Sequence, residues 1–178
     1  MTLSSTDMVV AGHRIASLAG FALVLGLLVA GAADGQTAGP DVDRVLIEKA
    51  ARRITLLSAD GAVVRVYRGI QLGWQPGGAK RFAGDGRTPE GHYRIDRGLD
   101  DSAFHLALHV SYPGLDDVAY AREQGRDPGG AIFIHGQPNA MTDRPPGDWT
   151  AGCVAVSNAE IEEIWSLVGD NTPVDIVP

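Results

Sequence analysis

FHLALHV, residues 104–110, alternates large apolar side chains with histidine and alanine. Because successive side chains of a β-strand point to opposite faces, this alternation predicts a strand with one apolar face. Segments of similar character are expected to form further strands at 53–58, 63–72, 91–96, 131–135, 154–156 and 172–177. The 178 residues, which include 23 glycines and 10 prolines, therefore favour one domain of short strands joined by turns.

One helix is well marked within this strand-rich pattern. The sequence SNAE at residues 157–160 has the Ser-x-x-Glu form of a capping box, and apolar residues follow at 161, 164, 165 and 168. This spacing predicts a helix at about 158–168 whose apolar face, including Trp165, packs on the core. A shorter helix is expected near 116–124. The predicted fold class is therefore mainly β, with two helices of unequal length.

The first 32 residues have the features of an export segment. Arg14 precedes an apolar run at 15–32, and the run ends in AGA, which matches the A-x-A pattern of a cleavage site. The run is also about as long as a membrane span requires. We therefore expect residues 1–32 to be a signal peptide or an N-terminal membrane anchor, and 33–43 to be a linker. The folded body, 44–178, is expected outside the cytoplasm, in the periplasm or cell envelope.

The composition excludes one class of partner. Hydrophobic residues make up 44% of the chain and charged residues 21%, as in an ordinary globular protein. The formal net charge is −7. Because binding to a phosphate backbone needs a basic face, this charge argues against a nucleic-acid partner.

Cys153 is the only cysteine of the chain and lies 18 positions after His135. A thiol becomes a nucleophile when an imidazole takes its proton, so the two residues are candidates for a catalytic imidazolium–thiolate pair. Exported chains usually pair their cysteines in disulfides, which makes a single one more informative. The alternative is that Cys153 is a small buried apolar residue, as most free cysteines are. Both interpretations stay open at the level of sequence.

A zinc site made of His105, His109, His135 and Cys153 is a further alternative. His105 and His109 lie on the same side of the predicted strand, but four residues of strand span about 13 Å. That separation is too large for both imidazoles to reach one ion without a bend. We therefore expect both histidines to face solvent, and we expect no metal and no cofactor.

Three short segments carry a likeness to a known family. They are GDGRTPEGHYRI at residues 84–95, IHG at 134–136 and TAGCV at 150–154. In this order they resemble the G-x-x-x-T-P-x-G-x-Y-x-I stretch, the His-Gly element and the Ser/Thr-x-Gly-Cys signature of the YkuD-type L,D-transpeptidase catalytic domain of bacterial cell-wall enzymes. The resemblance covers the chain from Arg53 onward.

The signature departs from the common form at two positions. Most members have His where this chain has Ala151, and Arg or Asn where it has Ala155. The run WTAGCVA is instead similar to a murein L,D-transpeptidase-like branch, some members of which act as hydrolases. We therefore expect this chain to lack the substrate contacts that the usual His and Arg would make.

The resemblance implies a β-sandwich-like catalytic fold and a role for each motif. Cys153 is the expected nucleophile and His135 the general base and acid. The backbone carbonyl of Gly136 is expected to orient the imidazole, and the backbone N–H of Gly152 to bind the oxyanion.

Three further side chains near these motifs are expected to contact substrate. Arg87 would meet a carboxylate, although an exposed arginine facing water is the ordinary alternative. Trp149 either walls the pocket or fills the core, and Thr150 precedes the Gly-Cys pair. The segment 137–147 between base and nucleophile is a candidate lid.

The implied substrate is the stem peptide of peptidoglycan, cut before its terminal D-Ala through a thioester on Cys153. Transfer of the acyl group to an amine would be L,D-transpeptidation. Transfer to water would make the chain a hydrolase that releases D-Ala or a wall-linked lipoprotein. A third alternative is a non-catalytic module that binds the wall. The expected partners are thus stem peptides, a wall-linked lipoprotein in the hydrolase case, and a membrane if the N-terminus stays as an anchor.

Overall fold

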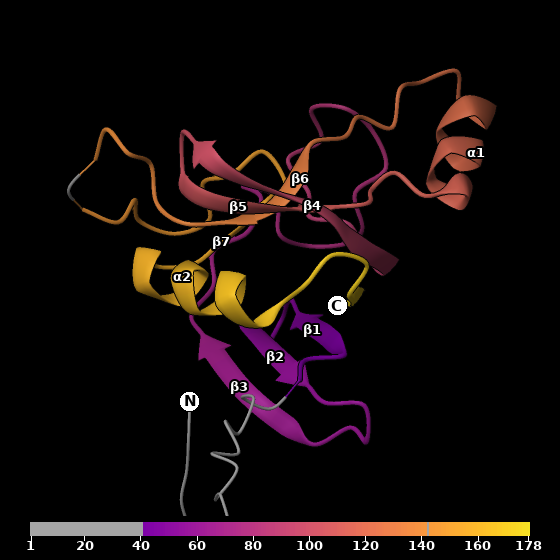
Figure 1. Ribbon diagram of the computed structural model, residues 1–178. Coiled ribbons are helices and arrows are strands. Elements are labelled where there is room, and N and C mark those ends of the chain that lie inside the picture. Colours follow the sequence, from indigo (N-terminus) through magenta and orange to yellow (C-terminus); the bar gives the residue numbers. More distant parts are fainter. Residues whose placement is uncertain (1–40, 142) are drawn as a thin grey trace, which may run out of the picture. The chain divides into compact units, whose positions relative to one another are not determined.

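The computed structural model describes residues 41–141 and 143–178, so the predicted export segment and most of the predicted linker lie outside the described residues. The described residues form β1 Arg44–Glu48, β2 Arg53–Leu57, β3 Val63–Arg68, β4 Gly91–Ser102, β5 His105–Val110, α1 Leu115–Glu123, β6 Ile132–His135, β7 Val154–Ala155, α2 Asn158–Leu167 and β8 Pro173–Val177 (Figure 1). The predicted mainly β fold with two helices is confirmed. Neither helix of this part of the chain has the length and apolar character needed to cross a bilayer.

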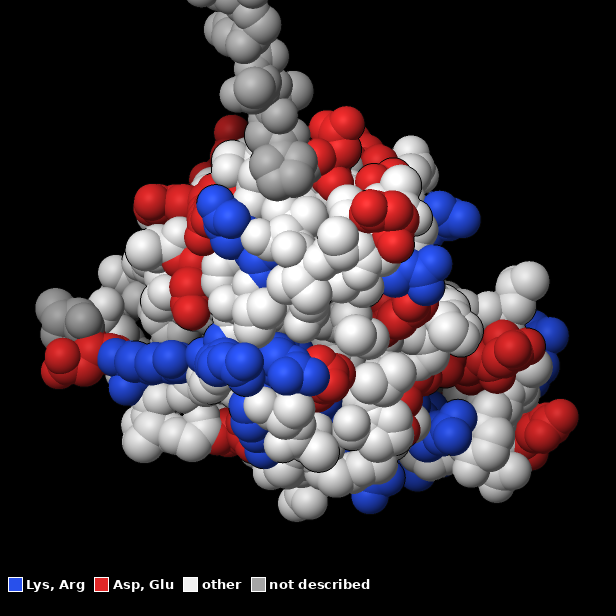
Figure 2. Space-filling model, turned by 90° about the horizontal axis from the view of Figure 1, so that it is seen from below, with Lys and Arg blue, Asp and Glu red and all other residues white. Residues whose placement is uncertain are grey.

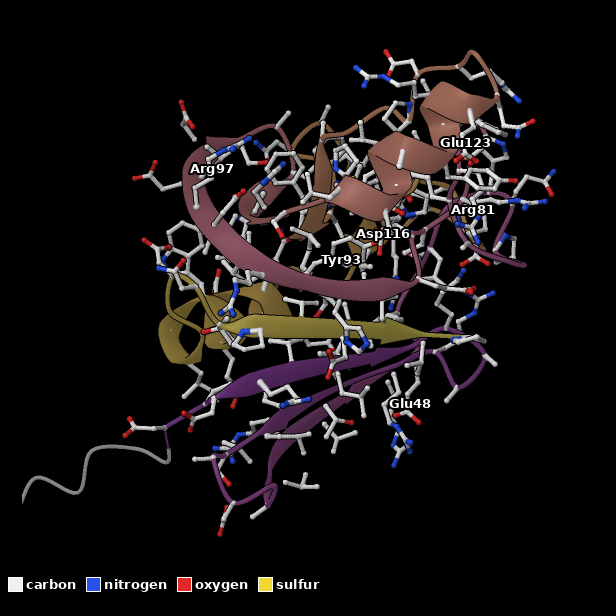
Figure 3. The ribbon with its side chains drawn as sticks, turned by 90° about the vertical axis from the view of Figure 1, so that its right-hand side faces the viewer. Glu48, Arg81, Tyr93, Arg97, Asp116 and Glu123 are labelled. Atoms are coloured by element: carbon white, nitrogen blue, oxygen red, sulfur yellow. The ribbon has the colours of Figure 1, made fainter. Side chains whose placement is uncertain are left out.

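The strand β4 joins two halves of one mixed sheet. The strand order is β3-β2-β1-β8-β4-β5-β6-β7, with parallel pairing of β1 with β8 and of β6 with β7. The first residues of β4 pair with β8 and the later ones with β5, and the register shifts after Ile95 and again after Leu99. Such irregularities bend a strand, and Figure 3 shows the curve of β4 between Tyr93 and Arg97. The bend lets both halves of the sheet pack on one core.

The core is built from both halves of the sheet and from α2. Buried apolar residues of β1, β2 and β8 meet those of β5 and β6, and α2 adds Ile161 and Ile164. The partly buried Trp165 packs closely over Gly98, where a Cβ would lie 2.4 Å from the indole ring. The apolar face predicted for the second helix therefore packs on the core as expected.

The two ends of the strand order are joined by the segment that follows β3. Gln71 forms a β-bridge with Ala155 of β7, and Gly73 forms one with Thr150. This closure is not visible in the sequence, because it unites segments about 80 residues apart. It places residues 71–73 directly beside the segment that carries Cys153.

The strand boundaries differ from the predicted ones in the first half of the chain. β1 was not among the predicted strands and forms a hairpin with β2, and β3 already ends at Arg68. β4 continues to Ser102, well beyond the predicted end. RGLDDS, residues 97–102, has no apolar alternation, so its strand conformation comes from pairing with β5 and not from its own pattern.

Two buried lysines hold the irregular segment between β3 and β4. The Nζ of Lys49 donates to the carbonyls of residues 78 and 88 at 2.6 and 3.1 Å, and pairs with Glu90 at 2.7 Å. The Nζ of Lys80 pairs with Asp85 at 3.0 Å. A buried ammonium needs such partners because it has lost its water. The segment that contains the Thr-Pro turn is therefore fixed in place although it has no regular structure.

Charged side chains of both signs alternate on the outer surface. Figure 2 shows acidic and basic side chains next to one another on one face, around a broad uncharged area. Two of the surface ion pairs join Arg44 to Asp175 at 2.7 Å and Arg65 to Glu163 at 2.6 Å. Exposed pairs of this kind add little to stability, so the fold depends mainly on its core and its buried polar contacts.

Replacing Ser157 by Ala should lower the free energy of unfolding by about 1 kcal/mol. The Ser157 Oγ accepts a hydrogen bond from the Glu160 N–H at 3.3 Å, and the Glu160 carboxylate accepts one from the Ser157 N–H at 2.8 Å. Urea denaturation measures the change. Ser166→Ala is the matched control, because that hydroxyl only donates back to the Glu163 carbonyl of the same helix. Equal losses in both variants would show that the cap is not responsible.

Candidate active site

A pocket of about 440 Å³ opens on the face of the sheet that β5 and β6 share. The alternation along β5 places His105, Ala107 and His109 on this face, and pairing with β6 brings Phe133 and His135 beside them. The pocket is lined by Leu99, Asp101, Ser102, Ala103, Phe104, Ala107, Ala131, Phe133, His135 and Cys153. Both residues of the predicted reactive pair thus line the same pocket.

His135 is held tightly at the end of β6. His135 is only 3% exposed, and its Nδ1 lies 2.7 Å from the Gly136 carbonyl oxygen. A carbonyl can only accept, so Nδ1 carries the proton and Nε2 is left as the acceptor. Phe104 and Trp149 pack on the ring with centroid distances of 4.7 and 5.8 Å. The imidazole is therefore oriented by one hydrogen bond and two aromatic contacts.

Cys153 lies immediately before β7 and is half-buried. Its Sγ lies 3.4 Å from the Ala131 carbonyl oxygen, to which the thiol donates. Burial raises the pKa of this thiol, while the Phe133 N–H and the charge of Lys80 act in the opposite direction. A thiol that donates a hydrogen bond to a carbonyl is protonated, in agreement with the raised pKa.

The resting pair is neutral. Burial lowers the pKa of His135, and the hydrogen bond to Gly136 only partly opposes this shift. With a raised pKa for the Cys153 thiol, neither group is charged near neutral pH. Burial of the two groups thus favours their uncharged forms over the imidazolium–thiolate pair considered from the sequence.

The hydroxyl of Thr150 organises the turn that carries Cys153. It donates to the Cys153 carbonyl at 2.7 Å and accepts from the Gly152 N–H at 3.1 Å. Thr150 itself is only 3% exposed. Two predictions are corrected by this geometry. Thr150 is buried and does not line the pocket, and the Gly152 N–H is already bonded inside the turn.

Gly152 is required by both space and backbone conformation. Its φ of +139° is a value that other residues rarely adopt, and a Cβ would lie 2.6 Å from the Arg87 carbonyl oxygen. Arg87 thus meets the turn through its backbone, while its guanidinium lies near Gly78 and outside the residues that line the pocket. The predicted contact of Arg87 with a substrate carboxylate is therefore not supported by its position.

Trp149 lies next to the pocket and packs on two residues that line it, Phe104 and His135. Its Nε1–H donates to Gln71 Oε1 at 3.1 Å. The indole thus packs behind the imidazole and is not itself one of the residues that line the pocket. Gln71 was not identified from the sequence, since a polar residue between Ile70 and Leu72 looks like an ordinary outward-facing strand position.

The two histidines of β5 are each paired with a carboxylate. His109 Nδ1 lies 2.6 Å from Asp96, and His105 Nε2 lies 2.7 Å from Glu162. His109 is only 8% exposed and packs edge-on against Phe133, so the expectation that it faces solvent is wrong. Across residues 41–141 and 143–178, no three His, Cys, Asp or Glu side chains gather as metal ligands would.

The L,D-transpeptidase catalytic-domain family matches this chain over residues 42–176, which include all three motifs. The chain belongs to this family. The family resemblance inferred from the sequence is thereby confirmed, and membership supports a function of the peptidoglycan transpeptidase type.

Individual relatives of this L,D-transpeptidase domain are similar over part of their length. The putative L,D-transpeptidase YafK of Escherichia coli K12 is 31% identical over 93 residues, which are 51% of this chain and 32% of YafK. The crystal structure of the helical cell shape determining protein Pgp2 from Campylobacter jejuni is 29% identical with a TM-score of 0.63, over 76% of this chain and 47% of Pgp2. Bd1075 of Bdellovibrio bacteriovorus is 25% identical with a TM-score of 0.56, over 80% of this chain and 50% of Bd1075. The chain thus spans half or less of each of these relatives.

Replacing Gly152 by Ala should lower the reactivity of Cys153, because the added Cβ would collide with the Arg87 carbonyl and displace the turn. We expect alkylation of Cys153 by iodoacetamide to slow by about 10- to 100-fold, the effect of displacing a reacting group by about 1 Å. Mass spectrometry of the modified protein gives the rate. Gly77→Ala is the control, since a Cβ there meets nothing within 4 Å. Native-like reactivity of the Gly152 variant would contradict the close packing of the turn.

The pH dependence of Cys153 alkylation should reveal a neutral resting pair. Because burial raises the pKa of the thiol, the rate should rise with pH through a midpoint above the ordinary value of about 8.5. The protein unfolded in urea provides the reference, and its midpoint should lie lower. A rate that is already at its maximum near pH 6 would show instead a preformed thiolate paired with His135.

Proposed function

We propose that this L,D-transpeptidase domain is a cysteine acyltransferase that acts on peptidoglycan stem peptides. The observation that carries the proposal is the shared pocket, which Cys153 and His135 both line and whose other walls are largely apolar. Transfer to an amine, L,D-transpeptidation, is the reaction typical of the family that the chain belongs to. Its expected site is the cell envelope, where the substrate is found. The name of Pgp2 adds cell-shape control as the proposed physiological setting.

The first half of the reaction follows from the neutral pair. As the Cys153 Sγ attacks the carbonyl carbon before the terminal D-Ala, its proton moves to His135 Nε2, which the Nδ1 contact with Gly136 leaves free to accept it. The charge on the carbonyl oxygen is stabilised by the Cys153 N–H, because the Gly152 N–H is bonded to Thr150. The C–N bond then breaks, the D-Ala amine leaves with the proton from His135, and a thioester remains on Cys153.

The second half regenerates the thiol. An incoming amine attacks the thioester carbonyl, gives its proton to His135 and forms an amide, while Cys153 leaves and takes back a proton. If water replaces the amine, the product is a carboxylate and the enzyme is a hydrolase. With an amide that links the wall to a lipoprotein as substrate, attack by Cys153 would release the lipoprotein as an amine, and water would then cleave the thioester and restore the thiol.

The hydrolase remains the second candidate because of two alanines in the signature. Ala155 is fully buried and pairs with Gln71, so a residue at this position has no route to an acceptor. Ala151 is exposed but has no polar group with which to bind one. A site with few polar contacts for an incoming amine is less able to exclude water from the thioester.

Incubating the purified protein with muropeptides that carry tetrapeptide stems should distinguish these reactions. Mass spectrometry should detect cross-linked dimers together with free D-Ala if the acceptor is an amine. Trimmed monomers without dimers would indicate hydrolysis, and unchanged muropeptides would favour a binding module.

The mechanism predicts the behaviour of two variants in the same assay. Cys153→Ser should abolish either product, because a serine hydroxyl is a far weaker nucleophile at neutral pH. His135→Gln keeps a polar side chain but removes the proton acceptor, so turnover should fall about 10²- to 10⁴-fold. Arg65 belongs to an exposed ion pair on β3, so Arg65→Gln should leave turnover unchanged. Full activity of the Cys153 variant would rule out the thioester route.

A further inference from the structure

We propose that Gln71 is a positioning residue for the reactive pair. Its side-chain amide holds both the segment that leads into Cys153 and the indole that packs against His135. The proposal rests on the proposed function for its turnover readout only, because thiol alkylation tests it without any substrate.

The backbone of Gln71 is fixed beside the nucleophile. Its N–H donates to the Ala155 carbonyl at 2.9 Å, and its own carbonyl accepts from the Ala155 N–H at 2.8 Å. Ala155 belongs to β7 and lies two residues after Cys153. Gln71 is only 7% exposed, so its side chain starts from a fixed and dry position next to the active site.

The side-chain amide uses its full hydrogen-bonding capacity. Its Nε2 donates to the carbonyls of Pro145 and Gly147, each at 2.6 Å. Its Oε1 accepts from Arg144 Nε at 2.7 Å and from Trp149 Nε1 at 3.1 Å. A primary amide has two N–H donors and one oxygen with two lone pairs, and all four are occupied here. No other side chain of the same length offers two donors and two acceptors in this arrangement.

All four partners lie in the segment 144–149, which directly precedes the turn of Thr150 and Cys153. This segment contains two prolines and a glycine, so it has few backbone bonds of its own to define its path. A second contact, from the Arg144 guanidinium to the Gly69 carbonyl, ties it to the same end of β3. Gln71 is therefore the common point from which the conformation of the segment is set.

The same amide reaches the base through Trp149. The indole ring lies 5.8 Å from the His135 ring in an edge-on arrangement and 5.8 Å from Phe104. Its Nε1–H can point in one direction only, and Gln71 Oε1 is the acceptor that fixes it. A shift of the indole would remove one of the two aromatic contacts that orient the imidazole, leaving the hydrogen bond to Gly136 and the packing of Phe104.

The decisive variant is Gln71→Glu, which keeps the size and shape of the side chain. A carboxylate still accepts from Arg144 and Trp149, but it brings negative oxygens against the carbonyls of Pro145 and Gly147 and has no proton to donate to them. We expect the segment and the indole to shift while the core is unchanged. Gln75→Glu is the matched control, because Gln75 is exposed and adds the same charge four residues along the same segment.

Turnover and alkylation should both respond in the Gln71→Glu protein. With muropeptides, kcat should fall about 10- to 100-fold with KM nearly unchanged, as expected for misplaced reacting groups. Alkylation of Cys153 should slow, and the midpoint of its pH profile should differ from that of the native protein. Circular dichroism and the melting temperature report whether the fold is kept, and Gln75→Glu should match the native protein in every measurement.

Trp149→Phe provides an independent test should the Gln71 variant fail to fold. It removes the Nε1–H together with the five-membered ring of the indole and keeps one six-membered aromatic ring behind His135, so a smaller loss of kcat and a shifted alkylation profile are expected. Native kcat and a native pH profile in a folded Gln71→Glu protein would overturn the proposal, as would a loss that merely follows the unfolded fraction. If native protein shows no turnover but Gln71→Glu still alters alkylation, the proposed function fails and the positioning role stands.

Discussion

The parallel pairing of β6 with β7 is the contact on which the site depends. His135 ends β6 and Cys153 directly precedes β7, and the register places His135 opposite Ala155. Two short strands, about 20 residues apart in the sequence, thereby bring the candidate base and the candidate nucleophile to one pocket. The bent β4 and the helix α2 support this pairing from either side, because they close the core beneath β5 and β6. Without it, the two side chains would belong to unconnected loops.

Burial determines how the pair works. The pocket is lined mainly by apolar and aromatic groups, and both pKa shifts favour the uncharged forms. In the proposed mechanism the thiol loses its proton only as it attacks, so His135 must be placed accurately for proton transfer and bond formation to coincide. The contacts of Gly136, Phe104 and Trp149 with the imidazole hold it in one orientation.

Polar groups buried around the site fix the irregular segments that the strands do not reach. Lys49 and Lys80 hold the loop whose Arg87 carbonyl lies against Gly152. The Thr150 hydroxyl bonds across the turn that carries Cys153. Gln71 holds the segment before it. Each of these buried side chains finds hydrogen-bond partners among the carbonyls or carboxylates of the irregular segments. A catalytic turn built without regular secondary structure is thereby as firmly held as the strands.

The sequence by itself determined most of the local elements and marked the candidate reactive residues. Alternation marked β5, the capping box marked α2, and a single cysteine downstream of a His-Gly element marked the pair, because these signals depend on neighbours in the chain. The tertiary structure alone decided the extension of β4, the burial of His109, the positions of Arg87 and Thr150, and the contacts of Gln71. The contacts of Arg87 and Gln71 join residues more than 60 positions apart, and those of β4, His109 and Thr150 join nearer partners. Neither kind of contact is specified by the type of a side chain or by its local pattern, because both depend on which partner the folded chain brings alongside.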